Sequence, residues 1–70
     1  MPDTALLNKL RIFRSQVGLT QEEMAQKTGV TRQTIISIEK GNYTPSVQLA
    51  LRLAKVLGIT VEELFYEEGE

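Results

Sequence analysis

Three segments of the chain begin with a similar helix-start pattern, and this repetition constrains the fold more than any other feature. Thr20 with Glu23, and later Thr60 with Glu63, have the spacing of a capping box, in which each side chain accepts a hydrogen bond from the other residue's free backbone N–H. An apolar residue precedes each threonine and another follows each glutamate, as in a hydrophobic staple. The pattern predicts short helices that begin at defined residues.

The third start departs from this pattern in one respect. Thr31 is again the expected N-cap, and Val30 and Ile35 form the staple, but the first turn has no glutamate: its three positions hold Arg32, Gln33 and Thr34. Because the helix macrodipole favours acids at the N-terminus, Arg32 is locally unfavourable. We interpret the departure as a functional demand, in which the start of this helix meets an anion that an acid would repel.

Glycines separate the helical segments, and the sequence predicts an all-α fold without strands. The first helix is expected to follow Thr4 as its N-cap, because apolar residues recur at helical spacing from Leu6 to Val17. The fourth is expected to begin at Thr44-Pro45, since proline is tolerated at the first helical position. The five predicted helices cover residues 5–17, 21–27, 32–40, 45–57 and 61–66, and residues 67–70 are expected to form a frayed acidic tail.

Residues 21–40 have the pattern of a helix-turn-helix unit. A short helix, a break at Thr28-Gly29-Val30 and an immediate second helix fit two helices joined by a short turn that contains glycine. Gly29 supplies the positive φ that such a turn requires. Ala25 offers a small side chain where the two helices approach each other. We therefore expect a single domain over residues 1–70 that is built around this unit.

Charge is divided unevenly along the chain, although its formal net charge is −1. All eight basic residues precede residue 62 and share that part with four acids, whereas residues 62–70 hold five glutamates and no base. A moderately basic body therefore precedes an acidic end, and phosphate binding depends on local charge rather than on the sum. Charge alone fits a merely solvated surface equally well.

The residue types that are missing exclude several classes of function. The chain has no Cys and no His, so disulfides are excluded, a zinc site would need carboxylates alone, and no nucleophile–base pair can use Cys or His. We expect no metal, no cofactor and no enzymatic activity. No apolar run reaches the roughly 18 residues of a membrane span, and the N-terminus lacks a signal-peptide pattern. A cytoplasmic protein without a membrane segment is therefore expected.

Several stretches between residues 10 and 66 carry a resemblance to a known family. They are Leu10-Arg11-x-x-Arg14, Gly18-Leu19-Thr20-Gln21-Glu22-Glu23-Met24-Ala25, Gly29-Val30-Thr31-Arg32-Gln33-Thr34-Ile35, Ile38-Glu39-Lys40-Gly41, Pro45-Ser46, Leu53-Ala54-x-x-Leu57-Gly58 and Glu63-Leu64-Phe65. The chain resembles the Cro and phage-repressor helix-turn-helix family, also called the xenobiotic-response-element family of bacterial and archaeal regulators. The resemblance implies a small stand-alone, lambda-repressor-like domain of five helices. It also implies a transcriptional regulator that binds a pseudo-palindromic site on double-stranded DNA. Because members of the family commonly act as homodimeric repressors, the resemblance favours a homodimeric repressor here.

Residues on one face of the predicted helix 32–40 are the candidates for reading bases. Arg32 could bond guanine O6 and N7, Gln33 could bond adenine N6 and N7, and Ser37 lies about one turn further along the same face. The resemblance assigns base reading to these three positions. Ile36 is unusual on such a face, and it either contacts a thymine methyl group or packs under the following loop. Without the family context, an ordinary polar helix face is the simpler interpretation.

A second group of residues is predicted to contact the DNA backbone. Free N–H groups at the start of the second helix suit a phosphate oxygen, and the resemblance places the loop after the third helix against the backbone. Tyr43 is alternatively a half-buried ring that covers this loop. The predicted phosphate contacts are Arg14, Thr20, Gln21, Thr31, Lys40, Asn42 and Tyr43.

The resemblance also implies an ion pair inside the domain. In many family members an arginine of the first helix meets a glutamate near the end of the third, and Arg14 and Glu39 occupy these positions. Such a pair would orient the third helix and leave Arg14 partly available to phosphate. The alternative is two independent exposed charges.

The last two helices carry more apolar residues than a body of this size is expected to bury. We interpret the surplus as a two-fold dimer interface, with scattered apolar surface residues as the alternative. Dimerisation fits DNA reading, because one such helix reads only a few base pairs. The predicted interface residues are Leu49, Leu51, Val56, Phe65 and Tyr66.

The main alternative to a stand-alone regulator is the antitoxin of a toxin–antitoxin pair. Some antitoxins use this fold and bind both DNA and a toxin protein. The acidic segment 62–70 could contact a basic protein partner. A partner that co-purifies with the chain would distinguish the two functions.

Overall fold

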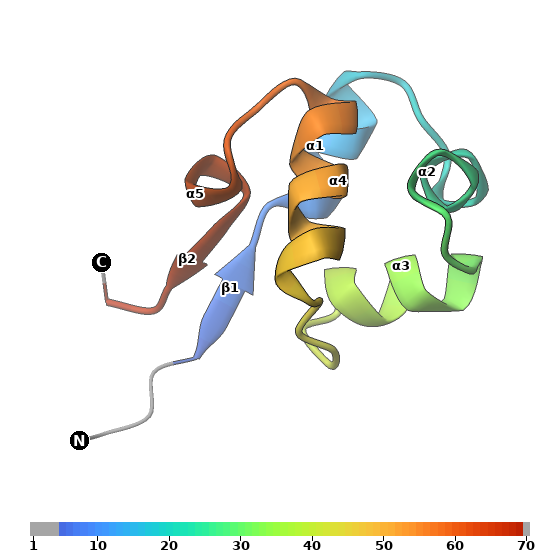
Figure 1. The fold of residues 1–70 in the computed structure, drawn as a ribbon. Helices are drawn as coiled ribbons and strands as arrows, with labels where there is room; N and C mark the ends of the chain where they lie inside the picture. Colours follow the sequence, from blue (N-terminus) through green and yellow to red (C-terminus); the bar gives the residue numbers. More distant parts are fainter. Residues whose placement is uncertain (1–4, 70) are drawn as a thin grey trace.

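The computed structural model describes residues 5–69, and five helices and two short strands make up this part of the chain. Figure 1 shows α4 beside α1, with α2 and α3 on one side and the paired strands on the other. The elements are β1 (Leu6–Asn8), α1 (Leu10–Gln16), α2 (Gln21–Thr28), α3 (Arg32–Glu39), α4 (Val47–Leu57), α5 (Val61–Leu64) and β2 (Phe65–Glu67). None of the described helices is long and apolar enough to cross a membrane.

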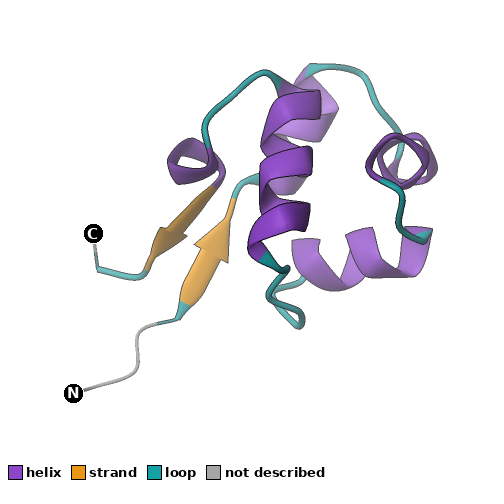
Figure 2. Cartoon of the chain, viewed as in Figure 1, coloured by secondary structure: helices purple, strands orange, loops and turns teal. Residues whose placement is uncertain are grey.

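The two strands correct the all-α prediction. β1 and β2 pair antiparallel as a two-stranded ribbon, with Leu6 opposite Glu67 and Asn8 opposite Phe65 (Figure 2). The N–H of Glu68 donates to the carbonyl of Ala5 at 2.9 Å and continues the pairing. The predicted helices 5–17 and 61–66 are therefore wrong at these ends, and so is the frayed tail predicted to begin at residue 67. The predicted cap at Thr4 lies outside the described residues.

The helix starts of α2 and α5 have the predicted capping boxes. The hydroxyl of Thr20 accepts from the N–H of Glu23 at 3.0 Å, and the N–H of Thr20 donates to the Glu23 carboxylate at 2.9 Å. Thr60 and Glu63 form the same pair of bonds at 3.1 and 2.9 Å. The backbone N–H of Thr20, and secondly its hydroxyl, lower the pKa of Glu23 below its ordinary value of 4.5. Local sequence is sufficient to specify these two starts.

The start of α4 lies two residues later than predicted. Ser46 is the N-cap, and its hydroxyl accepts from the N–H of Leu49 at 3.1 Å. Thr44 and Pro45 consequently belong to the loop before α4. The sequence offered two capping residues beside one proline, and the structure uses the serine that follows the proline.

All five helices contribute to one core, whose centre is the inner face of α4. The largest fully buried side chains of this core include Leu10 of α1, Met24 of α2, Ile35 and Ile38 of α3, and Leu53 of α4. Burying one such side chain contributes about 1.5–3 kcal/mol. The other core residues of the main cluster are Ala25, Leu49, Ala54, Leu57 and Leu64.

Leu49 is thus a core residue, and its assignment to the exposed apolar surplus is wrong. Its side chain is 7% exposed, whereas the nearby Leu51 is 57% exposed. Two positions along a helix correspond to a rotation of about 200°, so the two leucines face opposite directions.

The turn between α2 and α3 has the predicted geometry. Gly29 ends α2 with φ of 77°, and the following N–H of Val30 donates to the carbonyl of Ala25 at 3.0 Å. A residue with a side chain would be strained at this φ. Ala25 is 1% exposed, so a larger side chain there would have to displace its neighbours. The turn therefore places α3 across α2 with one face buried and the other outward.

Candidate nucleic-acid interface

The outward face of α3 presents the four residues that were expected to read bases. Arg32 and Gln33 are exposed, and Ile36 and Ser37 are half-buried. Ile35 and Ile38 of the same helix are fully buried. The helix is therefore amphipathic, with an apolar stripe that anchors it and an outward face that is available to a ligand.

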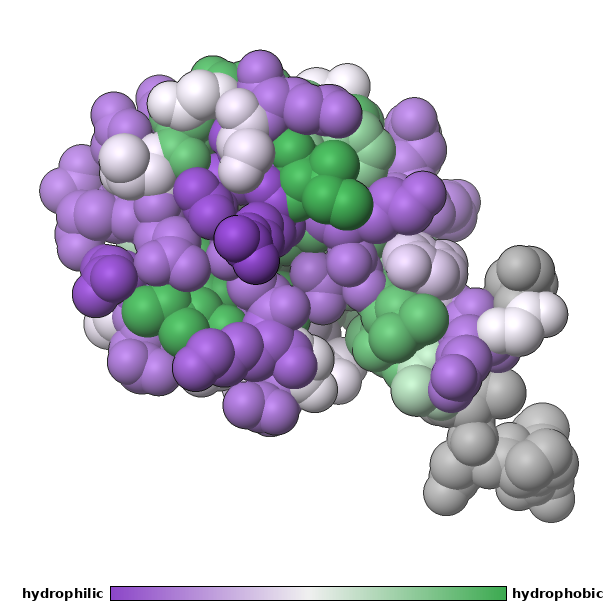
Figure 3. All heavy atoms as spheres, turned by 180° about the vertical axis from the view of Figure 1, so that it is seen from behind, coloured by the Kyte–Doolittle hydropathy of each residue, from purple (hydrophilic) through white to green (hydrophobic). Residues whose placement is uncertain are grey.

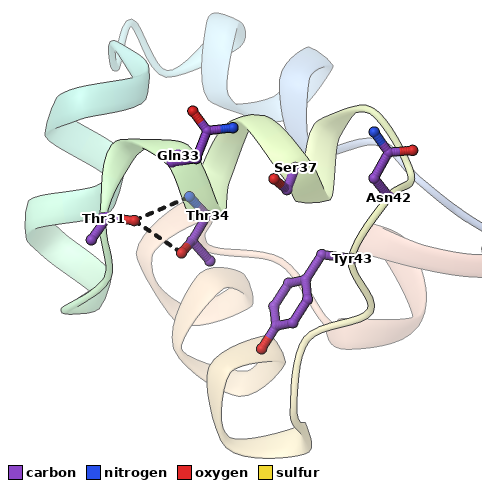
Figure 4. Close-up of a pocket in the computed structure, with 6 residues that line it drawn as sticks. All are labelled: Thr31, Gln33, Thr34, Ser37, Asn42 and Tyr43. Carbon is purple, nitrogen blue, oxygen red and sulfur yellow. Dashed lines mark hydrogen bonds between the residues drawn. The ribbon is translucent and has the colours of Figure 1, made fainter.

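A shallow hollow of about 300 Å³ runs along one side of this face (Figure 4). Thr31, Thr34 and Ser37 project from the start and middle of α3, and the ring of Tyr43 reaches back towards them from the loop that follows. Tyr43 is 48% exposed, so its ring is partly covered and partly available to a ligand. The lining residues are Thr31, Gln33, Thr34, Ser37, Asn42 and Tyr43.

A second hollow, of about 350 Å³, lies on the other side of α3, against α1 and the start of α2. Ile36 lines this hollow with residues of α1, and it is not among the residues that line the hollow beside the loop after α3. The residues around it are mostly charged or polar, and three of them are cations. The lining residues are Arg11, Arg14, Gln21, Ile36, Glu39 and Lys40.

Arg11 is the residue of this site that the sequence analysis missed. It is exposed and lies three positions before Arg14 on α1, so the two share one side of the helix. The signal was present in the stretch Leu10-Arg11-x-x-Arg14, but only the packing of α1 beside α3 shows that Arg11 and Lys40 border the same hollow. Cations that flank a reading helix suit contacts to the phosphate backbone.

Arg14 and Glu39 form an ion pair with 2.7 Å between Nε and Oε2, and their side chains are only 13% and 6% exposed. Arg14 also donates from Nη1 to the carbonyl of Leu19 at 2.8 Å and from Nη2 to Glu39 at 3.4 Å. These bonds join α1, the start of α2 and the end of α3. These bonds use three of the five N–H donors of Arg14, and its additional contact with phosphate stays a prediction.

Gln21 extends this network to the other end of α3. Its Nε2 donates to Glu39 Oε1 at 3.1 Å, and its Oε1 accepts from Arg32 Nη2 at 3.4 Å. One amide therefore connects both ends of α3 to the start of α2. The long contact to the exposed Arg32 orients the guanidinium loosely and leaves its other donors available to a ligand.

The predicted phosphate residues occupy two different kinds of position. The hydroxyls of Thr20 and Thr31 cap α2 and α3, since they accept from the N–H groups of Glu23 and Thr34. Lys40 and Asn42 are exposed at and just beyond the end of α3. Thr31, Lys40 and Asn42 line the two hollows beside α3. The contact of all four residues with phosphate stays a prediction.

The residues predicted to form a dimer interface do not lie on one surface. Val56 is half-buried and lines a hollow with Val17, Leu19 and Lys27. Tyr66 is 37% exposed and lies under the ammonium of Lys9, 5.5 Å from its ring centroid. Phe65, the preceding residue on the strand, lines a separate groove. The alternation of side chains along β2 separates Phe65 from Tyr66.

The groove beside Phe65 is lined by apolar side chains alone. It measures about 170 Å³ and runs between β1, the first half of α4 and the start of α5. Val47 at its edge is 79% exposed, and Leu51 lies one turn further along α4. On the face seen in Figure 3, by contrast, apolar residues form small patches separated by hydrophilic ones. The groove is lined by Leu6, Pro45, Val47, Ala50, Val61 and Phe65.

The helix-turn-helix family model matches residues 9–64, so it covers the described helices from α1 to α5. The chain belongs to this helix-turn-helix family. Its relatives are transcriptional regulators, which agrees with the resemblance drawn from the sequence.

Two relatives and one solved structure illustrate the similarity. An uncharacterised HTH-type transcriptional regulator of Methanocaldococcus jannaschii is 53% identical over 90% of this chain and 97% of its own length. The cryptic phage CTXphi transcriptional repressor RstR of Vibrio cholerae is 37% identical over 81% of this chain, which spans 51% of that protein. The restriction-modification controller protein C.AhdI of Aeromonas hydrophila is 35% identical, with a TM-score of 0.72, over 77% of this chain and 78% of the controller.

Proposed function

We propose that the chain is a sequence-specific regulator of transcription that binds double-stranded DNA with α3 in the major groove. The observation that carries this proposal is the outward face of α3, where Arg32 and Gln33 project beside a helix start that lacks acids. Arginine and glutamine are the side chains whose geometry matches guanine and adenine edges. The similarity to a phage repressor supports repression, in which a bound protein blocks the polymerase.

The two hollows beside α3 support the same proposal. A major groove is about 12 Å wide and admits one α-helix, whose flanks then face the two phosphate backbones. Arg11 and Lys40 border one hollow, while Asn42 and Tyr43 border the other. Both flanks of α3 therefore present donors to phosphate, and the base-reading side chains lie between them.

We further propose that two copies of the chain bind together, each through the apolar groove between β1, α4 and α5. An α3 of eight residues reads only a few base pairs, and a two-fold dimer doubles the site by placing half-sites about 34 Å apart. Val47 lines the groove, and the exposed Leu51 continues the apolar surface one turn further along α4. A second copy is the occupant that would cover this surface and also extend the reading of DNA.

In-vitro selection from a random duplex library tests the DNA proposal. The purified chain is expected to enrich a palindromic sequence with half-site centres about ten base pairs apart, at two salt concentrations. Absence of any enriched sequence at both concentrations would contradict sequence-specific binding. The variant Gln33→Ala in a parallel selection should lose preference at one position of each half-site while it still enriches the rest.

Sedimentation of the free chain and of the variant Leu51→Glu tests the dimer. A charge buried in an apolar interface loses its hydration without gaining a partner, so the variant should be a monomer at concentrations where the wild type is a dimer. Val17→Glu is the matched control, because Val17 is 49% exposed on a different surface. Equal association of all three proteins would contradict the proposed interface.

The antitoxin interpretation stays a prediction. The acidic residues Glu62 and Glu63 lie in the exposed first turn of α5, away from α3, so a protein partner bound there would leave the DNA face open. Co-purification of a basic protein with the chain from its own cells would support that function.

A further inference from the structure

Asn8 joins three elements of the fold through a single side chain. Its Nδ2 donates to the main-chain carbonyl of Ile38 at 2.9 Å, and its Oδ1 accepts from the N–H of Leu10 at 3.1 Å. Asn8 is the last residue of β1 and pairs with Phe65 of β2. Leu10 begins α1, and Ile38 lies in the last turn of α3. The half-buried Asn8 therefore ties the ribbon and the start of α1 to the end of α3.

The carbonyl that Asn8 contacts lies where a helix is short of donors. The last carbonyl groups of a helix lack intrahelical partners and need other hydrogen bonds. The N–H of Gly41 donates to Ile38 O at 2.9 Å, and Asn8 supplies the second donor. Because Ile38 is fully buried, removal of the amide would leave part of this oxygen's bonding capacity unused inside the protein.

The next residue of α3 is held from α1. Glu39 accepts from Arg14 at 2.7 Å, and Arg14 lies near the end of α1, whereas Asn8 ends β1 two residues before α1 begins. Two consecutive residues of α3 are thus attached at two separate points, one at the end of β1 and one near the end of α1. One attachment would allow the last turn of α3 to pivot, but two attachments fix its rotation as well as its position.

We propose that Asn8 is a positioning residue for DNA reading, which sets the orientation of α3 so that its outward side chains meet base edges in register. This inference rests on the proposed DNA-binding function. Bonds to base edges require accurate geometry, whereas phosphate contacts supply affinity without sequence information. Loss of the Asn8 amide therefore reduces the preference for the cognate sequence and leaves binding to other duplexes almost unchanged.

Two variants remove the donor to Ile38 without removing the contact to α1. Asn8→Ser keeps a hydroxyl that can accept from the N–H of Leu10, but it is too short to reach the carbonyl of Ile38. Asn8→Asp keeps Oδ1 as the acceptor for Leu10 but replaces Nδ2 with an oxygen, which places a carboxylate against that carbonyl. Gly58→Ala is the matched control, because its φ of 71° strains any residue with a side chain and its surroundings are open. The control lowers stability at the end of α4, which contains none of the Asn8 bonds.

Amide hydrogen exchange of the free chain tests the attachment without any DNA. The N–H groups of Gly41 and Asn42, which bond to Ile38 and Ser37, are expected to exchange roughly two- to tenfold faster in Asn8→Ser, the factor for one lost hydrogen bond. Amides of α2 serve as the internal reference. Gly58→Ala should also accelerate amide exchange, but the faster exchange should not be localised at the end of α3.

Binding to the selected duplex and to a scrambled duplex tests the consequence. Both Asn8 variants should lower the ratio of the affinity for the selected duplex to that for the scrambled duplex by roughly tenfold, and Asn8→Asp should lower it more. The change of affinity with salt concentration, which reports the number of phosphate contacts, should equal that of the wild type. Gly58→Ala should keep the wild-type ratio wherever it is folded. An unchanged ratio in both Asn8 variants, or exchange identical to that of the control, would overturn the proposal. If the wild-type chain binds both duplexes equally well, the proposed sequence-specific function is contradicted. The hydrogen-exchange measurement would in that case still show whether the Asn8 side chain fixes the end of α3.

Discussion

The two helices of the helix-turn-helix unit have the same length and the same kind of N-cap, but their charges run in opposite directions. α2 and α3 have eight residues each and begin after Thr20 and Thr31. α2 has two glutamates in its first turn and Lys27 in its last. α3 has Arg32 at its start and Glu39 at its end.

This difference separates a helix stabilised by its own sequence from one held by its neighbours. The charges of α2 agree with the helix macrodipole, and those of α3 oppose it. The opposing charge at the end of α3 is used in tertiary bonds, since Glu39 binds Arg14 and Gln21. The opposing charge at its start, Arg32, is exposed. We infer that Arg32 lowers the local stability of the start of α3 and that it is present because it contacts an anion.

Removal of Glu39 should produce the largest effect, because it breaks the tertiary attachment on which α3 depends. Glu39→Ala leaves the 13% exposed side chain of Arg14 without its carboxylate partner, which should lower the free energy of unfolding by about 3–5 kcal/mol. Chemical denaturation measures this loss. Glu22→Ala, which removes an exposed acid from α2, is the control and should cost several-fold less. Equal small losses in both variants would show that α3 does not depend on this attachment.

Removal of Arg32 should have a smaller effect, and it should fall on DNA binding rather than on folding. Arg32→Ala is expected to weaken binding to the selected duplex by about 1–3 kcal/mol and to relax one base position. Titration of the cognate duplex and of single-base variants measures both effects. Lys55→Ala removes an exposed cation from the last turn of α4 and should leave the base preference intact. Equal loss on all duplexes would mean that Arg32 touches phosphate alone.

Acid should weaken the start of α2 before that of α3. Because the pKa of Glu23 is lowered in the folded chain, its capping bonds stabilise α2 fully above the ordinary value of 4.5, and this contribution is lost as the pH falls through the lowered pKa. The Thr31 cap uses the N–H and hydroxyl of Thr34 and no carboxylate. Unfolding measured from pH 6 to 3 should therefore depend less on pH in Glu23→Gln than in the wild type. Parallel pH profiles would contradict this role of the α2 start.

The same comparison explains which parts of the fold could be predicted from the sequence. The starts of α2 and α5 depend on residues three apart, such as Thr20 and Glu23, so local spacing was sufficient. The ribbon depends on β1 meeting β2 from the opposite end of the chain, and no local pattern encodes that pairing. Its strands are three residues long, too short for a clear alternation.

Parts of the candidate site could not be predicted from the sequence either, because they depend on packing between elements. The resemblance supplied Arg14 and Glu39 as a pair, and the structure places them in contact. It could not show that Gln21 connects Glu39 to Arg32. The assignment of Leu49 failed since most positions of α4 near it are apolar, and periodicity alone does not reveal which leucine faces inward.

The variant Arg32→Glu tests the central claim most directly, since it gives α3 the acidic start that α2 already has. Stability and DNA affinity should move in opposite directions. Chemical denaturation should show an unchanged or higher free energy of unfolding, by up to about 1 kcal/mol. Binding to the selected duplex should fall by at least roughly a hundredfold, because a carboxylate replaces a cation beside the bases and phosphates. A variant that binds the duplex as tightly as the wild type, or that loses stability, would contradict the account.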